Sequence, residues 1–176
     1  EKSVDGFGMG PNLFLSQNDG TLMDAGFAAK YPVFTIASGP TNSMRGAAFL
    51  TGLSDAIVVD VGGTSTDVGV LKNGFPRESS VAIEVGGVRT NFRMPDVLSV
   101  PLGGGSIVRR NPICVGPQSV GLQLKEKSLV FGGSVTTATD IAAVAGMTVL
   151  GDRSKVSHLS NSVIGGVLNE IERMLA

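Results

Sequence analysis

Residues 57–71 read IVVDVGGTSTDVGVL, and this stretch decides the fold. Two apolar runs flank a short polar loop that has Asp60 on one side and Asp67 on the other. The β-branched residues of both runs predict two strands joined by a hairpin. Gly62 and Gly63 have no side chains that would keep the backbone amides from an anion. The sequence therefore predicts a phosphate-binding hairpin.

The polar side chains of this hairpin are the candidate site. The hydroxyls of Thr64, Ser65 and Thr66 can add hydrogen-bond donors around a phosphate. Asp60 and Asp67 could hold Mg2+ directly or through water, because this hard cation prefers carboxylate and water oxygens. The plain alternative is a hairpin whose glycines and hydroxyls only shape the turn. The flanking strands and the helical pattern before them favour phosphate binding.

Composition narrows the class of protein. The chain has 176 residues, a length typical of one domain with a sizeable core. Charged residues make up only 16% of it and the formal net charge is -1, which gives no electrostatic reason to expect nucleic acid or an anionic membrane as partner. One cysteine and one histidine cannot form an internal disulfide or a usual zinc site. This cysteine usage makes a reducing, cytoplasmic setting the expectation. No apolar stretch approaches the roughly 18 residues of a membrane span.

Ahead of the hairpin, strand and helix patterns alternate. Asn18-Asp19-Gly20 is a strong turn signal, although its polar side chains could also reach into a ligand cleft. The predicted elements are a strand over Asn12–Gln17, a helix over Thr21–Lys30, a strand over Val33–Ala37, and a helix that begins at Thr41, Asn42 or Ser43 and ends near Gly52.

From the hairpin onward, strands come first and helices last. The predicted strands are Ala56–Val61, Asp67–Lys72 and Glu78–Val85, with a turn at Asn73-Gly74. The segment Gly86–Asn111 is predicted to be irregular. Helices are predicted from Thr139 or Asp140 to about Val149 and from about Ser160 onward. No internal repeat or linker divides the chain. Residues 1–176 are therefore predicted to form one α/β lobe.

The run from Ser38 to Leu71 resembles the second phosphate segment, with its preceding helix, of the actin, sugar-kinase and heat-shock chaperone ATPase superfamily. Within that superfamily the chain resembles the hydantoinase/oxoprolinase family, the hydantoin-utilisation A-type subunits. The matching motifs are Ser38-Gly39-Pro40, Asp60–Asp67, Gly103–Ile107, Val115–Gly121 and Thr136–Ala142. The resemblance thus covers nearly the whole chain.

The resemblance implies a fold of two ribonuclease-H-like lobes with ATP and Mg2+ in the cleft between them. Each lobe of such a protein contributes one phosphate hairpin, and this chain has a single D-x-GGT hairpin. The chain also opens at Glu1 instead of methionine and stops within a helical pattern. We therefore expect one mixed-sheet lobe, a fragment that carries half of a nucleotide site and binds nucleotide weakly, if at all, by itself.

The resemblance also implies residue roles. Asp60 and Asp67 would be the catalytic and metal-binding residues, and Gly62 to Thr66 would hold the phosphates. Gly104 and Gly105 of the GGGSI run are further candidates for contact with phosphate or substrate, with a simple chain reversal as the alternative. Asp140 matches an acidic position of the family and also suits a helix cap.

The family chemistry is ATP-dependent hydrolysis of a small cyclic amide such as a hydantoin or 5-oxoproline. Phosphorylation turns the oxygen of a poorly electrophilic amide carbonyl into a leaving group, so catalysis depends on in-line positioning and charge neutralisation. A B-type partner subunit is a possible further component. The alternative is a non-catalytic nucleotide-binding or assembly lobe, because fold alone does not fix function within this superfamily.

Overall fold

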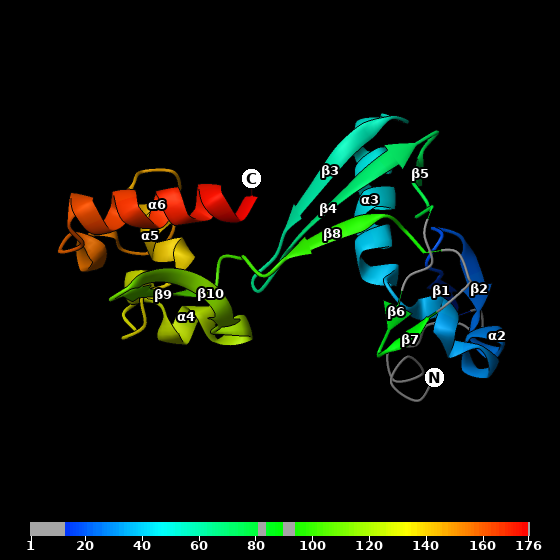
Figure 1. The fold of residues 1–176 in the computed structure, drawn as a ribbon, viewed down its shortest axis with the longest axis horizontal. Helices are drawn as coiled ribbons and strands as arrows, with labels where there is room; N and C mark the ends of the chain where they lie inside the picture. The colour runs from blue at the N-terminus through cyan, green and yellow to red at the C-terminus, as the bar shows by residue number, and fades with distance from the viewer. Residues whose placement is uncertain (1–12, 81–83, 90–93, 176) are drawn as a thin grey trace. The chain divides into compact units, whose positions relative to one another are not determined.

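The computed structural model of the chain describes residues 13–80, 84–89 and 94–175 (Figure 1). The chain divides into two compact units. The first consists of Glu1–Val59 and Val68–Leu98, and the second of Asp60–Asp67 and Ser99–Ala176. The tip of the predicted phosphate hairpin therefore belongs to the second unit. The single lobe expected from the sequence stays a prediction.

The first unit begins with a small antiparallel pair, β1 (Phe14–Ser16) and β2 (Leu22–Asp24). Helix α2 (Ala25–Lys30) follows directly, with the Asp24 side chain accepting a hydrogen bond from the Phe27 amide at 3.0 Å. The predicted helix over Thr21–Lys30 was therefore wrong in its first residues. Those residues pair with β1 instead, and the cap at Asp24 sets where the helix starts.

The predicted strand over Val33–Ala37 was wrong, because Pro32–Thr35 form a 3-10 helix. Proline presets the backbone angle of a first helical turn, and the Thr35 hydroxyl closes this turn by donating to the Pro32 carbonyl at 2.7 Å. The next helix, α3 (Ser38–Thr51), begins before the predicted Thr41. Its first turn includes Pro40, which is tolerated there because the amides of a first turn have no partner within the helix.

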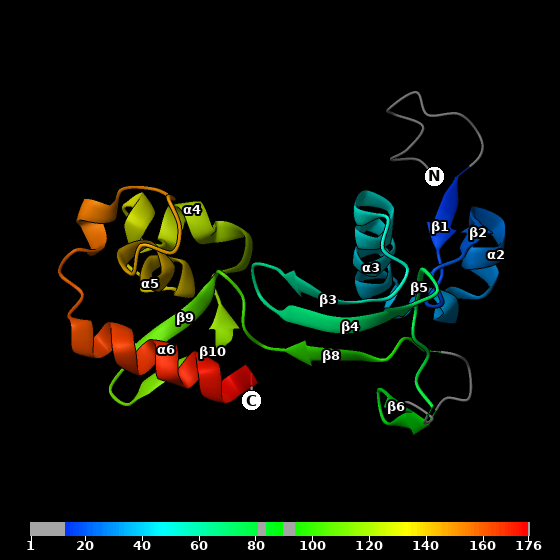
Figure 2. The same cartoon turned by 90° about the horizontal axis from the view of Figure 1, so that it is seen from above.

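Helix α3 lies against one face of the sheet formed by β3 (Ala56–Val61), β4 (Thr66–Lys72), β5 (Phe75–Pro76) and β8 (Val97–Val100), as Figures 1 and 2 show. The buried Met44 of α3 meets β4 at Gly69, where a Cβ would lie 2.3 Å from the Met44 sulfur. The prediction of β3 is confirmed at both ends, and β4 starts one residue earlier than predicted. The helix ends at Gly52 in the left-handed conformation, as predicted.

The region between β4 and the second unit differs from expectation. Phe75–Pro76 pair with β4, and the predicted strand Glu78–Val85 contributes only β6 (Glu84–Val85), which forms a hairpin with β7 (Val88–Arg89). Residues 81–83 of that predicted strand lie outside the described residues, as does Asn12 of the first one. The segment predicted to be irregular contains β7, β8 and β9 (Ser106–Arg110). Its glycines mark turns between short strands.

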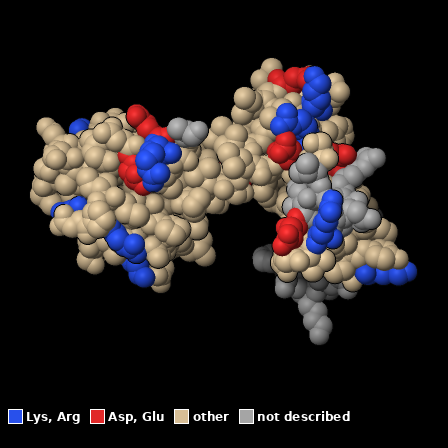
Figure 3. Space-filling view, viewed as in Figure 1, with Lys and Arg blue, Asp and Glu red and all other residues tan. Residues whose placement is uncertain are grey.

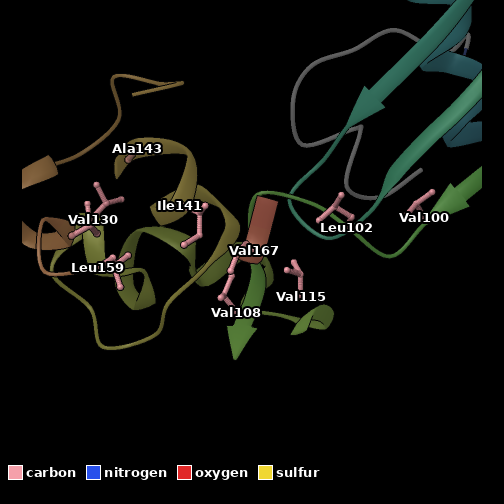
Figure 4. Packing of buried hydrophobic residues seen from close by; sticks show 10 residues of the cluster. Val100, Leu102, Val108, Val115, Val130, Ile141, Ala143, Leu159 and Val167 are labelled. Carbon is pink, nitrogen blue, oxygen red and sulfur yellow. The ribbon is translucent and has the colours of Figure 1, made fainter. Parts of the chain in front are cut away.

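The second unit packs its helices on a long antiparallel hairpin of β9 and β10 (Ile113–Ser119). Helices α4 (Leu124–Lys127), α5 (Ala138–Val144) and α6 (Asn161–Leu175) follow. Figure 4 shows Val108 of β9 close to Val167 of α6 within the buried cluster, which also includes Val115, Val130 and Ile141. Helix α6 starts within one residue of the prediction. Helix α5 ends earlier than predicted, because Gly146 adopts a positive φ of 78° just after it.

Replacing Val167 with alanine is expected to destabilise the second unit by about 2 kcal/mol. Val167 has 0% exposure and lies in the middle of α6, so the lost methyl groups leave a cavity in the cluster. Urea unfolding of the chain followed by circular dichroism measures the change. Leu175→Ala on the same helix is the control, because Leu175 is 55% exposed. An equal loss in both variants would contradict the assignment of Val167 to the core.

The surface agrees with the low content of charged residues. Most of the face drawn in Figure 3 is neither basic nor acidic, and its lysines and arginines do not merge into a continuous basic area. Across residues 13–80, 84–89 and 94–175, the helices are too short or too polar to cross a bilayer.

Candidate functional site

The predicted phosphate hairpin is a tight loop between β3 and β4. The Gly62 amide donates to the Ser65 carbonyl at 2.9 Å, which closes the loop. Gly62, Gly63 and Thr64 are exposed and Ser65 is half-buried. The loop therefore offers backbone and hydroxyl groups to solvent, as binding of an anion requires.

The two candidate carboxylates lie where the strands meet the loop. Asp60 is the residue before the last in β3, Asp67 is the second in β4, and both are half-buried. The Ser99 hydroxyl donates to Asp67 and thereby orients its carboxylate. Within the described parts of the chain, no three His, Cys, Asp or Glu side chains gather into a metal-binding group.

Thr66 lies on the inner side of the hairpin. It is 4% exposed, and its hydroxyl donates to the Leu102 carbonyl at 2.6 Å. This hydroxyl therefore supports the loop from within the second unit. The exposed Thr64 and half-buried Ser65 are the loop hydroxyls nearer to solvent.

Gly104 and Gly105 contact the hairpin through their backbone. The Gly104 amide donates to the Gly62 carbonyl at 3.0 Å, and the Gly105 amide donates to the Gly63 carbonyl at 2.7 Å. Both amides are thus occupied by the loop, which differs from the expectation that they bind phosphate. The GGGSI run nevertheless belongs to the same site, since it contacts the phosphate loop directly.

Glycine is required in this run because the two backbones approach closely. A Cβ on Gly103 would lie 2.6 Å from the Gly62 oxygen, and a Cβ on Gly105 would lie 2.8 Å from the Gly63 oxygen. Real Cβ atoms do not tolerate such contacts with backbone. Sequence reasoning missed Ser119, whose hydroxyl also donates to the Gly63 carbonyl, at 3.2 Å. Its segment, Val115–Gly121, matches a family motif, but nothing local connects this serine with the hairpin, because Gly63 lies 56 residues away.

Asp140 is a cap and not a site residue in this structure. Its carboxylate has 0% exposure and accepts hydrogen bonds from the hydroxyls of Ser128 and Thr137 and from three backbone amides. With Thr137 it forms the capping box of α5. The structure therefore favours the helix-cap alternative.

Two surface hollows lie within the first unit. One of about 290 Å³ is lined by the end of α3, the residues that follow it and Gly74, and includes Arg45 and Phe49. The other, of about 510 Å³, is lined by β1, α2 and the 3-10 helix after it. Neither includes a predicted site residue, so neither is the candidate site.

Comparison with known proteins places the chain. The sequence model of the family described as Hydantoinase/oxoprolinase matches residues 1–149. The chain belongs to this family. The matched region contains every predicted site residue of the hydantoinase/oxoprolinase chain, from Asp60 to Gly105. The expected family membership is thereby confirmed.

This hydantoinase/oxoprolinase chain is similar to a curated protein and to a solved structure. The chain is 30% identical over 119 residues to the acetophenone carboxylase gamma subunit of Aromatoleum aromaticum, an alignment that covers 64% of the chain and 16% of that protein. It is also 21% identical to acetone carboxylase, whose nucleotide-free structure was described for the mechanism of ATP-dependent acetone carboxylation. That match has a TM-score of 0.73 and covers 98% of this chain and 28% of the other.

The structural match confirms the predicted fold class, a mixed α/β arrangement with antiparallel sheets. Both relatives are much longer than this chain. The chain spans 16% of the length of its curated relative and 28% of the matched structure.

Proposed function

We propose that the chain supplies one of two phosphate-binding hairpins to the ATP site of a longer enzyme that hydrolyses a small cyclic amide. The observation that carries this proposal is the exposed Gly62–Thr64 loop between two half-buried carboxylates. Family membership and the ATP-dependent reaction named for the matched structure support the use of ATP. Hydantoin and 5-oxoproline are the substrates that suit the family description.

Hydrolysis of a cyclic amide needs activation because an amide carbonyl is a poor electrophile. Transfer of the γ-phosphoryl group of ATP to the carbonyl oxygen releases ADP and leaves a good leaving group on carbon. Water then adds to that carbon, the ring C–N bond breaks as the nitrogen takes up a proton, and an acyl phosphate remains. A second water hydrolyses the acyl phosphate to phosphate and the open acid. Positioning and charge neutralisation at the phosphates provide most of the catalysis for the first step.

The residue roles follow from the hairpin. Asp60 and Asp67 would hold Mg2+, directly or through water, and the bound ion would neutralise charge on the phosphates. Gly63, Thr64 and Ser65 would contact phosphate oxygens, and Gly62, whose amide donates to the Ser65 carbonyl, would shape the loop. Thr66, Gly104 and Gly105 would position this loop, since their donors are already engaged with backbone carbonyls.

A second candidate reaction is ATP-dependent carboxylation of a ketone, which the names of the two relatives favour. Both reactions would begin with phosphorylation of an oxygen derived from a carbonyl group, so one hairpin could serve either. The gamma-subunit name of one relative also supports the expectation of partner subunits. A non-catalytic lobe that binds nucleotide without turnover is the remaining alternative.

The test is to supply the full-length protein, with any co-purifying subunits, with Mg-ATP and one candidate substrate at a time. We expect release of ADP that depends on hydantoin or 5-oxoproline. Stimulation only by a ketone with bicarbonate would replace hydrolysis by carboxylation. ATP binding without stimulation by any of these compounds would favour the non-catalytic alternative.

Removal of Mg2+ by EDTA is expected to abolish ATP turnover by the full-length protein, and added Mg2+ should restore it. The physical reason is that the two carboxylates alone would repel the phosphates, whereas a bound cation reverses the local charge. The measurement is release of ADP before and after EDTA, with excess Mg2+ as the control. Full turnover in EDTA would contradict the metal role of the hairpin.

A further inference from the structure

We propose that Gly104, Gly105 and Ser119 form a carbonyl clamp that turns two consecutive backbone amides of the phosphate loop outward. The clamp holds the carbonyls of Gly62 and Gly63 through three hydrogen bonds, of 3.0 Å from Gly104, 2.7 Å from Gly105 and 3.2 Å from Ser119. The inference rests on the proposed function, because it assigns these three residues to positioning the phosphate site.

The direction of the amides follows from peptide geometry. In a planar trans peptide the C=O and the following N–H point in opposite directions. A Gly62 carbonyl directed at the clamp therefore turns the Gly63 N–H away from it, and the Gly63 carbonyl does the same for the Thr64 N–H. Both residues are exposed. Two successive amides on one exposed side make a small anion-binding concavity.

The clamp is itself held in place on all sides. The Gly103 amide donates to the Ser106 hydroxyl at 2.9 Å, and Ser106 has 0% exposure. The Gly104 carbonyl accepts hydrogen bonds from both the amide and the hydroxyl of Thr139, at 3.0 and 2.8 Å. The Gly105 carbonyl accepts from the Val120 amide at 2.9 Å. Rigid support of this kind fixes the amides before an anion arrives, which is how a site gains affinity without new contacts.

The close approach to the loop also explains two of the three glycines of the run. Gly103 and Gly105 lie so close to the loop that a Cβ on either would meet loop backbone at 2.6 to 2.8 Å. An alanine at these positions would push the loop away and tilt its carbonyls. The Gly-Gly-Gly-Ser motif therefore allows the backbone of the loop to pack closely against it. Its own amides do not serve the ligand.

Ser119→Ala is the sharpest variant, because it adds no bulk and removes the donor to the Gly63 carbonyl, together with an acceptor of the Gly121 amide. We expect the Kd and KM for Mg-ATP to rise about 3- to 10-fold, the size expected for one hydrogen bond, with the unfolding midpoint unchanged. Ser119→Thr keeps the hydroxyl and should restore affinity. Ser134→Ala, at an exposed serine of the same unit, is the matched control. Normal affinity in Ser119→Ala would overturn the role of that residue.

Gly105→Ala tests the close approach. We expect a loss of Mg-ATP affinity and turnover of about 100-fold or more, because a displacement near 1 Å at a positioned group costs that much. Gly165→Ala is the control, since a Cβ there meets nothing within 4 Å. Hydrogen exchange of segment 60–67 without nucleotide should be faster in Gly105→Ala and unchanged in Gly165→Ala.

The readouts separate failure of the clamp from failure of the proposed function. If the wild-type protein neither binds nor hydrolyses Mg-ATP, the proposed function fails, and hydrogen exchange of segment 60–67 still decides whether the clamp holds the loop. If the wild type binds Mg-ATP and Asp60→Asn does not, the ATP site stands. Normal Mg-ATP affinity of both Ser119→Ala and Gly105→Ala would then overturn the clamp.

Discussion

Asp60→Asn is expected to lower ATP turnover by the full-length protein about 100- to 1,000-fold, with little change in its unfolding midpoint. The asparagine amide has the shape of the carboxylate and lacks its charge. The variant would therefore bind Mg2+ more weakly without leaving a cavity. Asp60 is half-buried at the end of β3, where such a replacement is tolerated structurally. The measurement is the initial rate of ADP release at saturating Mg-ATP.

Asp67→Asn should show a loss of the same order, because Asp67 occupies the matching place on the other strand of the hairpin. Ser99→Ala removes the hydroxyl that donates to Asp67, and a smaller loss of about 10-fold is expected, as is usual for a group that orients a metal ligand. Raising the Mg2+ concentration should recover part of the lost rate in each variant. Recovery distinguishes weakened metal binding from damage to the loop.

Asp55→Asn is the matched control for these substitutions. Asp55 lies just before β3, is exposed, and pairs with Lys72 at 2.8 Å. The hydrogen bond from Lys72, followed by that from Ser54, holds the pKa of Asp55 below its ordinary value, so this carboxylate is charged at neutral pH. Its loss should leave ATP turnover unchanged. Unchanged turnover in Asp60→Asn and Asp67→Asn as well would remove the metal role of both.

Local patterns in the sequence were sufficient for the hairpin itself. Alternating β-branched residues and a glycine turn act over a few residues, and strand β3 was predicted at both ends. The end of α3 at Gly52 and the start of α6 follow from equally local signals. The 3-10 helix at Pro32–Thr35 was missed because its apolar run satisfies a strand pattern and a proline-led turn equally well.

The hydrogen bonds that hold the hairpin loop in place could not be predicted, because they join residues that are far apart in the sequence. The hydrogen bond from Ser119 to Gly63 spans 56 residues, and that from Thr66 to Leu102 spans 36. A glycine run shows in sequence only that the backbone needs room. The backbone that occupies this room is the loop of residues 60–67, which belongs to the second unit.

Asp140→Ala is expected to destabilise the second unit by about 4 kcal/mol or more, because a buried donor without a partner costs about 1 to 3 kcal/mol. One carboxylate oxygen accepts from the Ser128 hydroxyl and the Val130 amide, both at 2.7 Å. The other accepts from the amide and hydroxyl of Thr137, at 2.7 and 2.9 Å, and from the Leu129 amide at 3.4 Å. Truncation leaves the Val130 and Thr137 amides without an acceptor in a space closed to water, whereas the Leu129 amide keeps a second acceptor, the Val135 carbonyl at 3.2 Å.

Asp140→Asn should be nearly as harmful, and this variant separates a structural from a catalytic role. Donors surround both carboxylate oxygens, so the NH2 group of asparagine must point at another donor whichever way the amide turns. Asp152→Ala, at an exposed cap of the same unit, is the control and should unfold close to the wild type. Urea unfolding followed by circular dichroism measures all three variants. If Asp140→Asn unfolded like the wild type and lost only ATP turnover, Asp140 would return to the site as the acidic residue that the family resemblance first suggested.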